Sequence, residues 1–287
     1  MLVDKSRRVR KASFVARVEG WSQTLPFRWA VAPAYAVVQE DDGAAVQAVG
    51  GSDDAVRLYA PLKDTPGLFW DFARLGEKLA SEPGEAERDA LVLAWVRRYG
   101  LLGTQHIPTL VHLPSGPAYR IPHEEPVADI VTYALRAHTF LSLYDLVLRN
   151  DAAGLRARVR LVEKGSFRDL EVDGESVPGA IFREDEVPSL TPQALEEAAI
   201  AHLLWRLRGY LRFVSPDVER LTQRTVHGSR RWDLTRTWVM GDLRTAMMFQ
   251  FYLDLTGSGQ QKTGFCVACG EPFPLTKKDR KYCDRCL

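Results

Sequence analysis

The chain opens with short segments in which apolar and polar residues alternate, a pattern that predicts small β-strands. Residues 14–18 and 35–39 show this alternation, and Asp41-Asp42-Gly43 and Gly50-Gly51 are typical of turns. Three large aromatic residues lie between the two runs: Trp21, Phe27 and Trp29. We expect their rings in the core, because buried aromatic side chains dominate core energetics. A platform for stacking bases is the alternative.

The apolar period then changes to steps of three and four residues, which predicts helices. Such steps cover 66–80, 85–99 and 127–149, with Gly100 placed to end the second helix. Five prolines between residues 103 and 126 exclude a long helix there. We therefore expect a loop or an excursion with edge strands in that stretch.

A second β region and a second helical block follow the long helix. Residues 157–162 alternate, and Asp173-Gly174 is a hairpin signal. Thr191 is expected to cap a helix that begins at Pro192, and Ser215-Pro216 ends it. The last helix is predicted over 233–255, with Trp238 on its apolar side. The pattern thus predicts an α+β fold that is mostly helical with small β regions.

Composition and charge are those of an ordinary globular protein. Of its 287 residues, 46% are hydrophobic and 26% are charged, so the chain is long enough to fold without disulfides. No apolar run approaches the ~18–20 residues that span a bilayer. No apolar signal-peptide segment follows the basic residues between Lys5 and Lys11, which predicts a cytoplasmic location. A net charge of +1 means that any contact with nucleic acid must use local patches.

The four cysteines form one cluster near the C-terminal end. Their pattern is C-x2-C-x13-C-x2-C, made by Cys266, Cys269, Cys283 and Cys286. Two C-x2-C turns direct four thiolates at one point, and this tetrahedral all-sulfur set suits Zn²⁺, with a rubredoxin-like iron site as the alternative. Four thiolates leave no open coordination position, so we expect a structural zinc of the ribbon or knuckle type. The predicted organisation is a body over 1–256 with a sub-boundary near 150–155, a linker over 257–264 and a finger over 265–287.

Cationic residues lie between the two cysteine pairs, at the tip of a predicted hairpin. A compact basic loop beside an aromatic ring is what phosphate contact and base stacking require. We therefore expect the finger to bind DNA or RNA. The candidate contacts are Lys277, Lys278, Arg280, Lys281, Tyr282 and Arg285. Arginines around His227 form a second basic cluster: Arg224, Arg230, Arg231 and Arg236.

Two passages together resemble a known group of bacterial proteins. The run LVLAWVRRYGLLG over 91–103 resembles a helix end found in that group, and the cysteine tail resembles its C-terminal zinc fingers. The named group that this layout resembles is that of bacterial regulators ending in a CGNR-type zinc finger. In those regulators the second cysteine pair is more widely spaced and is followed by Gly-Asn-Arg, which this sequence lacks. The resemblance implies the four cysteine ligands and no catalytic residues.

These features favour a zinc-containing nucleic-acid-binding protein, either a regulator or a subunit of a nucleoprotein or defence complex. One alternative is an interaction module with a purely structural zinc, which would bind other protein subunits through the face around Trp21, Phe27 and Trp29. Another is an enzyme whose site lies in the 103–126 loop. That site would use His106, His112 and His123 with Glu124. His138 and His202 are expected to be hydrogen-bonded core histidines.

Overall fold

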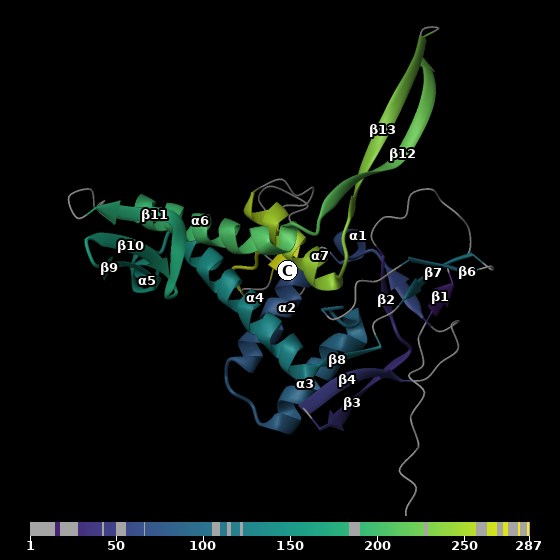
Figure 1. The fold of residues 1–287 in the computed structure, drawn as a ribbon, viewed down its shortest axis with the longest axis horizontal. Coiled ribbons are helices and arrows are strands. Elements are labelled where there is room, and N and C mark those ends of the chain that lie inside the picture. Colours follow the sequence, from purple (N-terminus) through teal and green to yellow (C-terminus); the bar gives the residue numbers. More distant parts are fainter. Residues whose placement is uncertain are drawn as a thin grey trace, which may run out of the picture.

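The computed structural model gives a mixed fold of helices and small antiparallel sheets, which confirms the predicted mixture of the two (Figure 1). The described residues are 15–17, 28–41, 43–49, 56–65, 67–104, 110–113, 116–120, 123–183, 190–226, 229–256, 263–268, 272–274, 281 and 286. No helix among them has the length and apolar character needed to cross a membrane.

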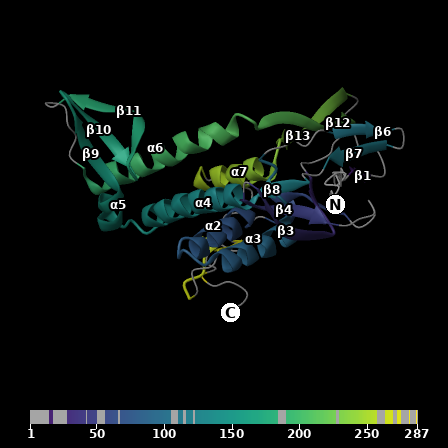
Figure 2. The ribbon, with the colours of Figure 1, turned by 60° about the horizontal axis from the view of Figure 1, so that its bottom comes forward.

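Helices form the centre of the molecule, and α4 lies against both α2 and α6 (Figure 2). The helices are α1 (Pro61–Asp64), α2 (Leu68–Leu79), α3 (Glu85–Tyr99), α4 (Val127–Leu148), α5 (Ala152–Arg158), α6 (Pro192–Leu211) and α7 (Leu243–Leu255). The core joins segments that are far apart in sequence. The ring of Phe69 in α2 stacks on that of Phe251 in α7, with centroids 4.3 Å apart.

The predicted helix ends are confirmed where a specific residue marks them. The Thr191 hydroxyl caps α6 by accepting a hydrogen bond from the Ala194 N–H at 3.2 Å. Gly100 ends α3 with φ of 89°, a left-handed conformation that favours glycine. The short helix α5 was not predicted. It begins at Asp151, whose carboxylate accepts a hydrogen bond from the Gly154 N–H at 2.9 Å.

Gly76 lets α2 and α4 cross at close range. A Cβ atom added at Gly76 would lie 2.0 Å from the carbonyl oxygen of Ala134 and 2.8 Å from the Cβ of His138. No side chain fits there without moving one helix. His138 itself is half-buried rather than in the core. His202 is buried as predicted, but its Nδ1 has no hydrogen-bond partner in the described part of the chain.

Small antiparallel sheets lie at the two ends of the helical centre (Figure 2). The strands are β1 (Val15–Arg17), β2 (Trp29–Val31), β3 (Ala34–Glu40), β4 (Gly43–Val49), β5 (Arg57–Tyr59), β6 (Leu110–Leu113), β7 (Gly116–Arg120), β8 (Glu124–Pro126), β9 (Val159–Lys164), β10 (Phe167–Val172) and β11 (Glu175–Arg183). The sheets are β1-β7-β6, β2-β5, β3-β4-β8 and β11-β10-β9. Trp29 is buried, as predicted, while Trp21 and Phe27 lie outside the described residues.

The prediction of a helix from residue 233 is wrong. Residues up to Val239 belong to a long hairpin of β12 (Ser215–Val226) and β13 (Ser229–Val239), which projects from the body in Figure 1. In the segment 232–239, Trp232, Leu234 and Trp238 fall at even-numbered positions, and Thr235 and Thr237 lie between the last two, which favours a strand. Trp238 therefore lies in β13, and α7 starts only at Leu243, where the Asp242 carboxylate caps it.

Two glycine-to-alanine substitutions should change stability in opposite directions. Gly76→Ala should lower the free energy of unfolding by about 1–3 kcal/mol, because the added methyl group overlaps α4. Gly209→Ala in α6 should raise it by about 0.5–1 kcal/mol, because its Cβ meets no atom within 4 Å and alanine is the better helix former. Equilibrium urea denaturation measures both. A Gly76→Ala variant as stable as the unsubstituted chain would contradict the close crossing.

Candidate anion-binding pocket and cysteine finger

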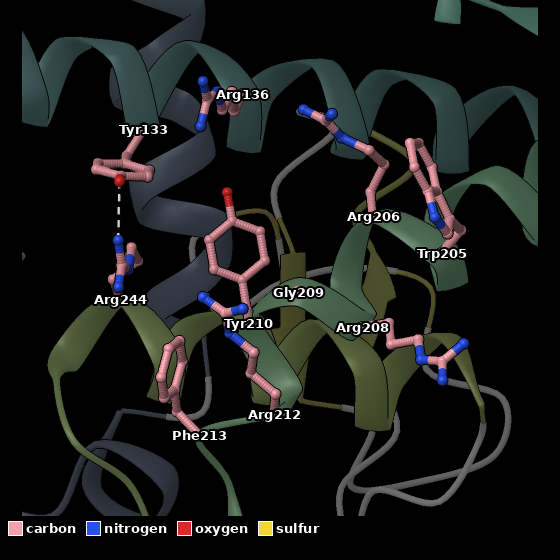
Figure 3. A pocket seen from close by; sticks show the side chains of 10 residues that line it. All are labelled: Tyr133, Arg136, Trp205, Arg206, Arg208, Gly209, Tyr210, Arg212, Phe213 and Arg244. Carbon is pink, nitrogen blue, oxygen red and sulfur yellow. Dashed lines mark hydrogen bonds between the residues drawn. The ribbon is translucent and has the colours of Figure 1, made fainter. Parts of the chain in front are cut away.

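An open pocket of about 730 Å³ lies where the C-terminal half of α6 meets α4 and the start of α7 (Figure 3). Arginines dominate its lining: Arg136, Arg206, Arg208, Arg212 and Arg244. Aromatic rings fill the spaces between them: Tyr133, Trp205, Tyr210 and Phe213. No carboxylate is among the described residues that line it, so the pocket is strongly positive.

Helix α6 supplies most of this surface through one exposed face. Trp205, Arg208 and Arg212 follow each other at steps of three and four residues, so their side chains leave the helix on the same side. Gly209 lies between them, and a Cβ at that position would meet nothing within 4 Å. The absence of a side chain at Gly209 keeps the space between the arginines open.

The positive charge of the pocket is only partly neutralised. Arg206 forms an ion pair with Glu175 at 3.0 Å, and Arg244 forms one with Asp242 at 3.2 Å. Among the described residues, Arg136, Arg208 and Arg212 have no carboxylate within ion-pair distance. As far as the described residues go, these three guanidinium groups are open to an anion, and a concave basic surface concentrates anionic ligands.

Arg244 is the most enclosed of these cations, with its side chain 15% exposed. It donates a hydrogen bond to the Tyr133 hydroxyl at 2.8 Å, and its guanidinium lies over the rings of Tyr133 and Tyr210. Its buried Nε has no hydrogen-bond acceptor in the described part of the chain. Burial alone would lower the pKa of Arg244, but Asp242 and Tyr133 raise it overall, so the group stays charged.

A buried carboxylate positions the start of α7 and therefore Arg244. Glu125 in β8 is 1% exposed. Its Oε2 accepts hydrogen bonds from the N–H groups of Leu102 at 2.6 Å and Gly103 at 3.3 Å. Its Oε1 accepts from the N–H of Thr104 at 3.0 Å and from the Thr104 hydroxyl. Burial raises the pKa of Glu125, and these four hydrogen bonds oppose the rise.

The loop that Glu125 holds, residues 101–104, also forms hydrogen bonds with β2 and α7. The Trp29 indole N–H donates to the Leu101 carbonyl at 2.9 Å, and the Leu243 N–H donates to the Leu102 carbonyl at 3.0 Å. Gly103 has φ of 79°, and a Cβ there would lie 2.7 Å from the Trp29 ring. The run LLG, singled out in the sequence for its resemblance, is thus the place where β2, β8 and α7 meet.

The C-terminal finger is described only in part, and a backbone hydrogen bond joins its two ends within the described residues. Strands β14 (Thr263–Phe265) and β15 (Pro272–Pro274) form a hairpin, with the buried Cys266 directly after β14. The Val267 N–H donates to the Lys281 carbonyl at 2.9 Å, two residues before Cys283. The exposed Cys286 and Lys281 are also described.

Several predicted site residues lie outside the described part of the chain: Cys269, Lys277, Lys278, Arg280, Tyr282, Cys283 and Arg285. Within the described part, no three histidine, cysteine, aspartate or glutamate side chains gather as a metal-binding group. Cys269 and Cys283, two of the four predicted zinc ligands, do not belong to that part. The zinc site and the basic loop therefore stay predictions.

The loop proposed as an enzyme site forms the β6–β7 hairpin and strand β8. His106 lies outside the described residues, and His112 is described only as part of the β6 backbone. Glu124 accepts a hydrogen bond from the Gln47 amide at 3.2 Å. The described side chains therefore leave the alternative of an enzyme as a hypothesis.

Sequence reasoning did not find the pocket, because three helices distant in sequence build it. One signal was present in the run WRLRGYLRF over 205–213, where arginine and aromatic residues surround the buried Leu207 and the half-buried Leu211. The pattern was interpreted only through those leucines.

No protein-family model matches the chain, and no curated protein or solved structure matches it either. A function must therefore be inferred from the geometry of the pocket and from the cysteine pattern.

The hydrogen bonds of Glu125 should contribute measurably to the free energy of unfolding. Glu125→Gln should lower the free energy of unfolding by about 1–3 kcal/mol, because the amide nitrogen faces backbone donors that it cannot accept from. The neighbouring Glu124→Gln is the control and should cost less than about 1 kcal/mol. Urea denaturation of both variants measures the difference. Equal stabilities would contradict the role given to Glu125.

Proposed function

We propose that this protein binds nucleic acid, with phosphates in the arginine pocket and a zinc-stabilised finger that presents further cations. The observation that supports the proposal best is the pocket itself. Three of its five arginines have no carboxylate partner among the described residues, and aromatic rings lie between them. Planar guanidinium groups match phosphate geometry in a bidentate way, and aromatic rings are the natural partners of bases.

The finger adds a second basic surface in this proposal. Zinc would be held by Cys266, Cys269, Cys283 and Cys286, and it would supply the folding energy of a segment too short to form its own core. The hydrogen bond from Val267 to Lys281 supports the proposal, because it joins the residue after Cys266 to a residue two positions before Cys283. The loop cations Lys277, Lys278, Arg280 and Lys281 would then contact phosphates, with Tyr282 packing beside them and Arg285 nearby. Reduced thiols fit a cytoplasmic protein.

Removing two arginines from the pocket should weaken binding and its dependence on salt. The slope of log K against log salt concentration is negative. For Arg208→Gln/Arg212→Gln it should become shallower by about 0.7–0.9 for each phosphate that the pocket no longer neutralises. Fluorescence anisotropy with a labelled oligonucleotide of mixed sequence, between low and moderate salt, measures the slope.

The matched control is Arg160→Gln/Arg183→Gln, which removes the same charge from exposed positions on β9 and β11. It should leave the slope close to that of the unsubstituted protein. If the slope becomes shallower by the same amount in both double variants, the pocket has no special part in binding and the proposal fails.

The finger should carry one zinc ion for each chain. Native mass spectrometry should detect it, and Cys266→Ser should remove it, because three thiolates bind zinc far more weakly than four. Cobalt substitution should give the absorption of a tetrahedral thiolate site. A metal-free chain in which the Val267 amide stays protected from hydrogen exchange would contradict the zinc proposal.

A further inference from the structure

The pocket carries two large aromatic residues that are exposed without an evident structural need. Trp205 is 40% exposed and Phe213 is 48% exposed. They lie at opposite ends of the α6 segment that lines the pocket, with Gly209 between them (Figure 3). Exposed aromatic residues that cluster at a pocket mark a binding surface more often than isolated ones do.

An arginine is stacked on each of these rings. The guanidinium carbon of Arg212 lies 4.6 Å from the centre of the Phe213 ring, and that of Arg206 lies 5.9 Å from the centre of the Trp205 ring. Arg212 has no carboxylate partner among the described residues and could hold a phosphate while the Phe213 ring contacts the attached base, whereas Arg206 beside Trp205 is already paired with Glu175. The pattern of ring and cation repeats at the two ends of the pocket.

Bases in a duplex are stacked on one another, so their faces are closed to a protein ring. In a single strand the faces are free, and every base offers one, whatever the sequence. A duplex would contact only the arginines and would leave both rings exposed to water. The exposed rings thus add binding energy for a single strand alone.

We infer that the pocket selects single-stranded nucleic acid, DNA or RNA, by stacking bases on Trp205 and Phe213 while its arginines bind the phosphates. This inference depends on the proposed function, since it names the form of nucleic acid that the same pocket takes. The rings supply the preference for single strands, and the arginines supply the general attraction to phosphate.

The test measures affinity by fluorescence anisotropy for four labelled probes. These are a single-stranded DNA 15-mer of mixed sequence, the RNA of the same sequence, the DNA duplex, and an abasic DNA strand of the same length. The unsubstituted protein should bind at least one single strand about tenfold or more tighter than the duplex and the abasic strand. The DNA and RNA arms show which sugar the pocket prefers.

Trp205→Ala/Phe213→Ala should weaken binding of the single strand by about thirtyfold or more and leave the duplex and abasic affinities unchanged. The control Trp205→Phe/Phe213→Tyr keeps both rings and should retain most of the affinity. Thermal unfolding checks that both variants fold, which their exposed positions favour.

Equal affinity for duplex and single strand, or an alanine variant that binds the single strand as well as the unsubstituted protein does, would overturn the inference while the proposed function stands. If none of the four probes binds at low salt, the proposed function itself fails, and the inference fails with it.

Discussion

The buried carboxylate of Glu125 is the constraint on which the arrangement of the helices and the pocket depends. A carboxylate removed from water must be paired or fully hydrogen-bonded, or its burial costs several kcal/mol. Glu125 meets this requirement through the N–H groups of Leu102, Gly103 and Thr104. The same hydrogen bonds fix a loop that carbonyl contacts then connect to Trp29 and to the first residue of α7. One side chain thus couples β8, β2, the end of α3 and the start of α7.

The geometry of the pocket depends on the loop that Glu125 holds. Arg244 is the second residue of α7, so the position of the helix start decides where the guanidinium lies relative to Tyr133 and Tyr210. Collecting like charges in one concavity is unfavourable unless partners offset the repulsion. Asp242 and the tyrosine rings offset it for Arg244, and Glu175 offsets it for Arg206, whereas Arg208 and Arg212 have no carboxylate partner among the described residues. An anionic ligand would complete the balance of charge, which is the physical reason for proposing a phosphate-bearing one.

The sequence predicted the elements whose signals are local. Helices α2, α3, α4 and α6 followed from a steady apolar period, and residues such as Thr191 and Gly100 marked their ends. The β12–β13 hairpin was missed because the apolar residues before Leu243 were counted into a helical stripe, although Trp232, Leu234 and Trp238 share the period of two that a strand has. Within a short window the helical period and the strand period share many positions. The His227-Gly228 pair, which indicates a turn in the sequence, was given no weight.

The two candidate sites also differ in whether a local sequence pattern reveals them. The cysteine finger is a local pattern, so its ligands could be named from spacing alone. The pocket depends on contacts between Tyr133, the 205–213 segment and Arg244, and no spacing rule relates residues that far apart. Glu125 is not a candidate in the sequence, because nothing local reveals that a carboxylate will be buried against the loop at 101–104.

The most direct test of this account is amide hydrogen exchange, followed residue by residue by NMR, in the unsubstituted protein and in Glu125→Gln. If Glu125 holds the loop and the loop holds α7, protection should fall together at Leu102, Gly103 and Leu243, while α2 keeps its protection. Loss of protection confined to the loop, with the Leu243 amide exchanging as slowly as before, would contradict the coupling between the buried carboxylate and the pocket.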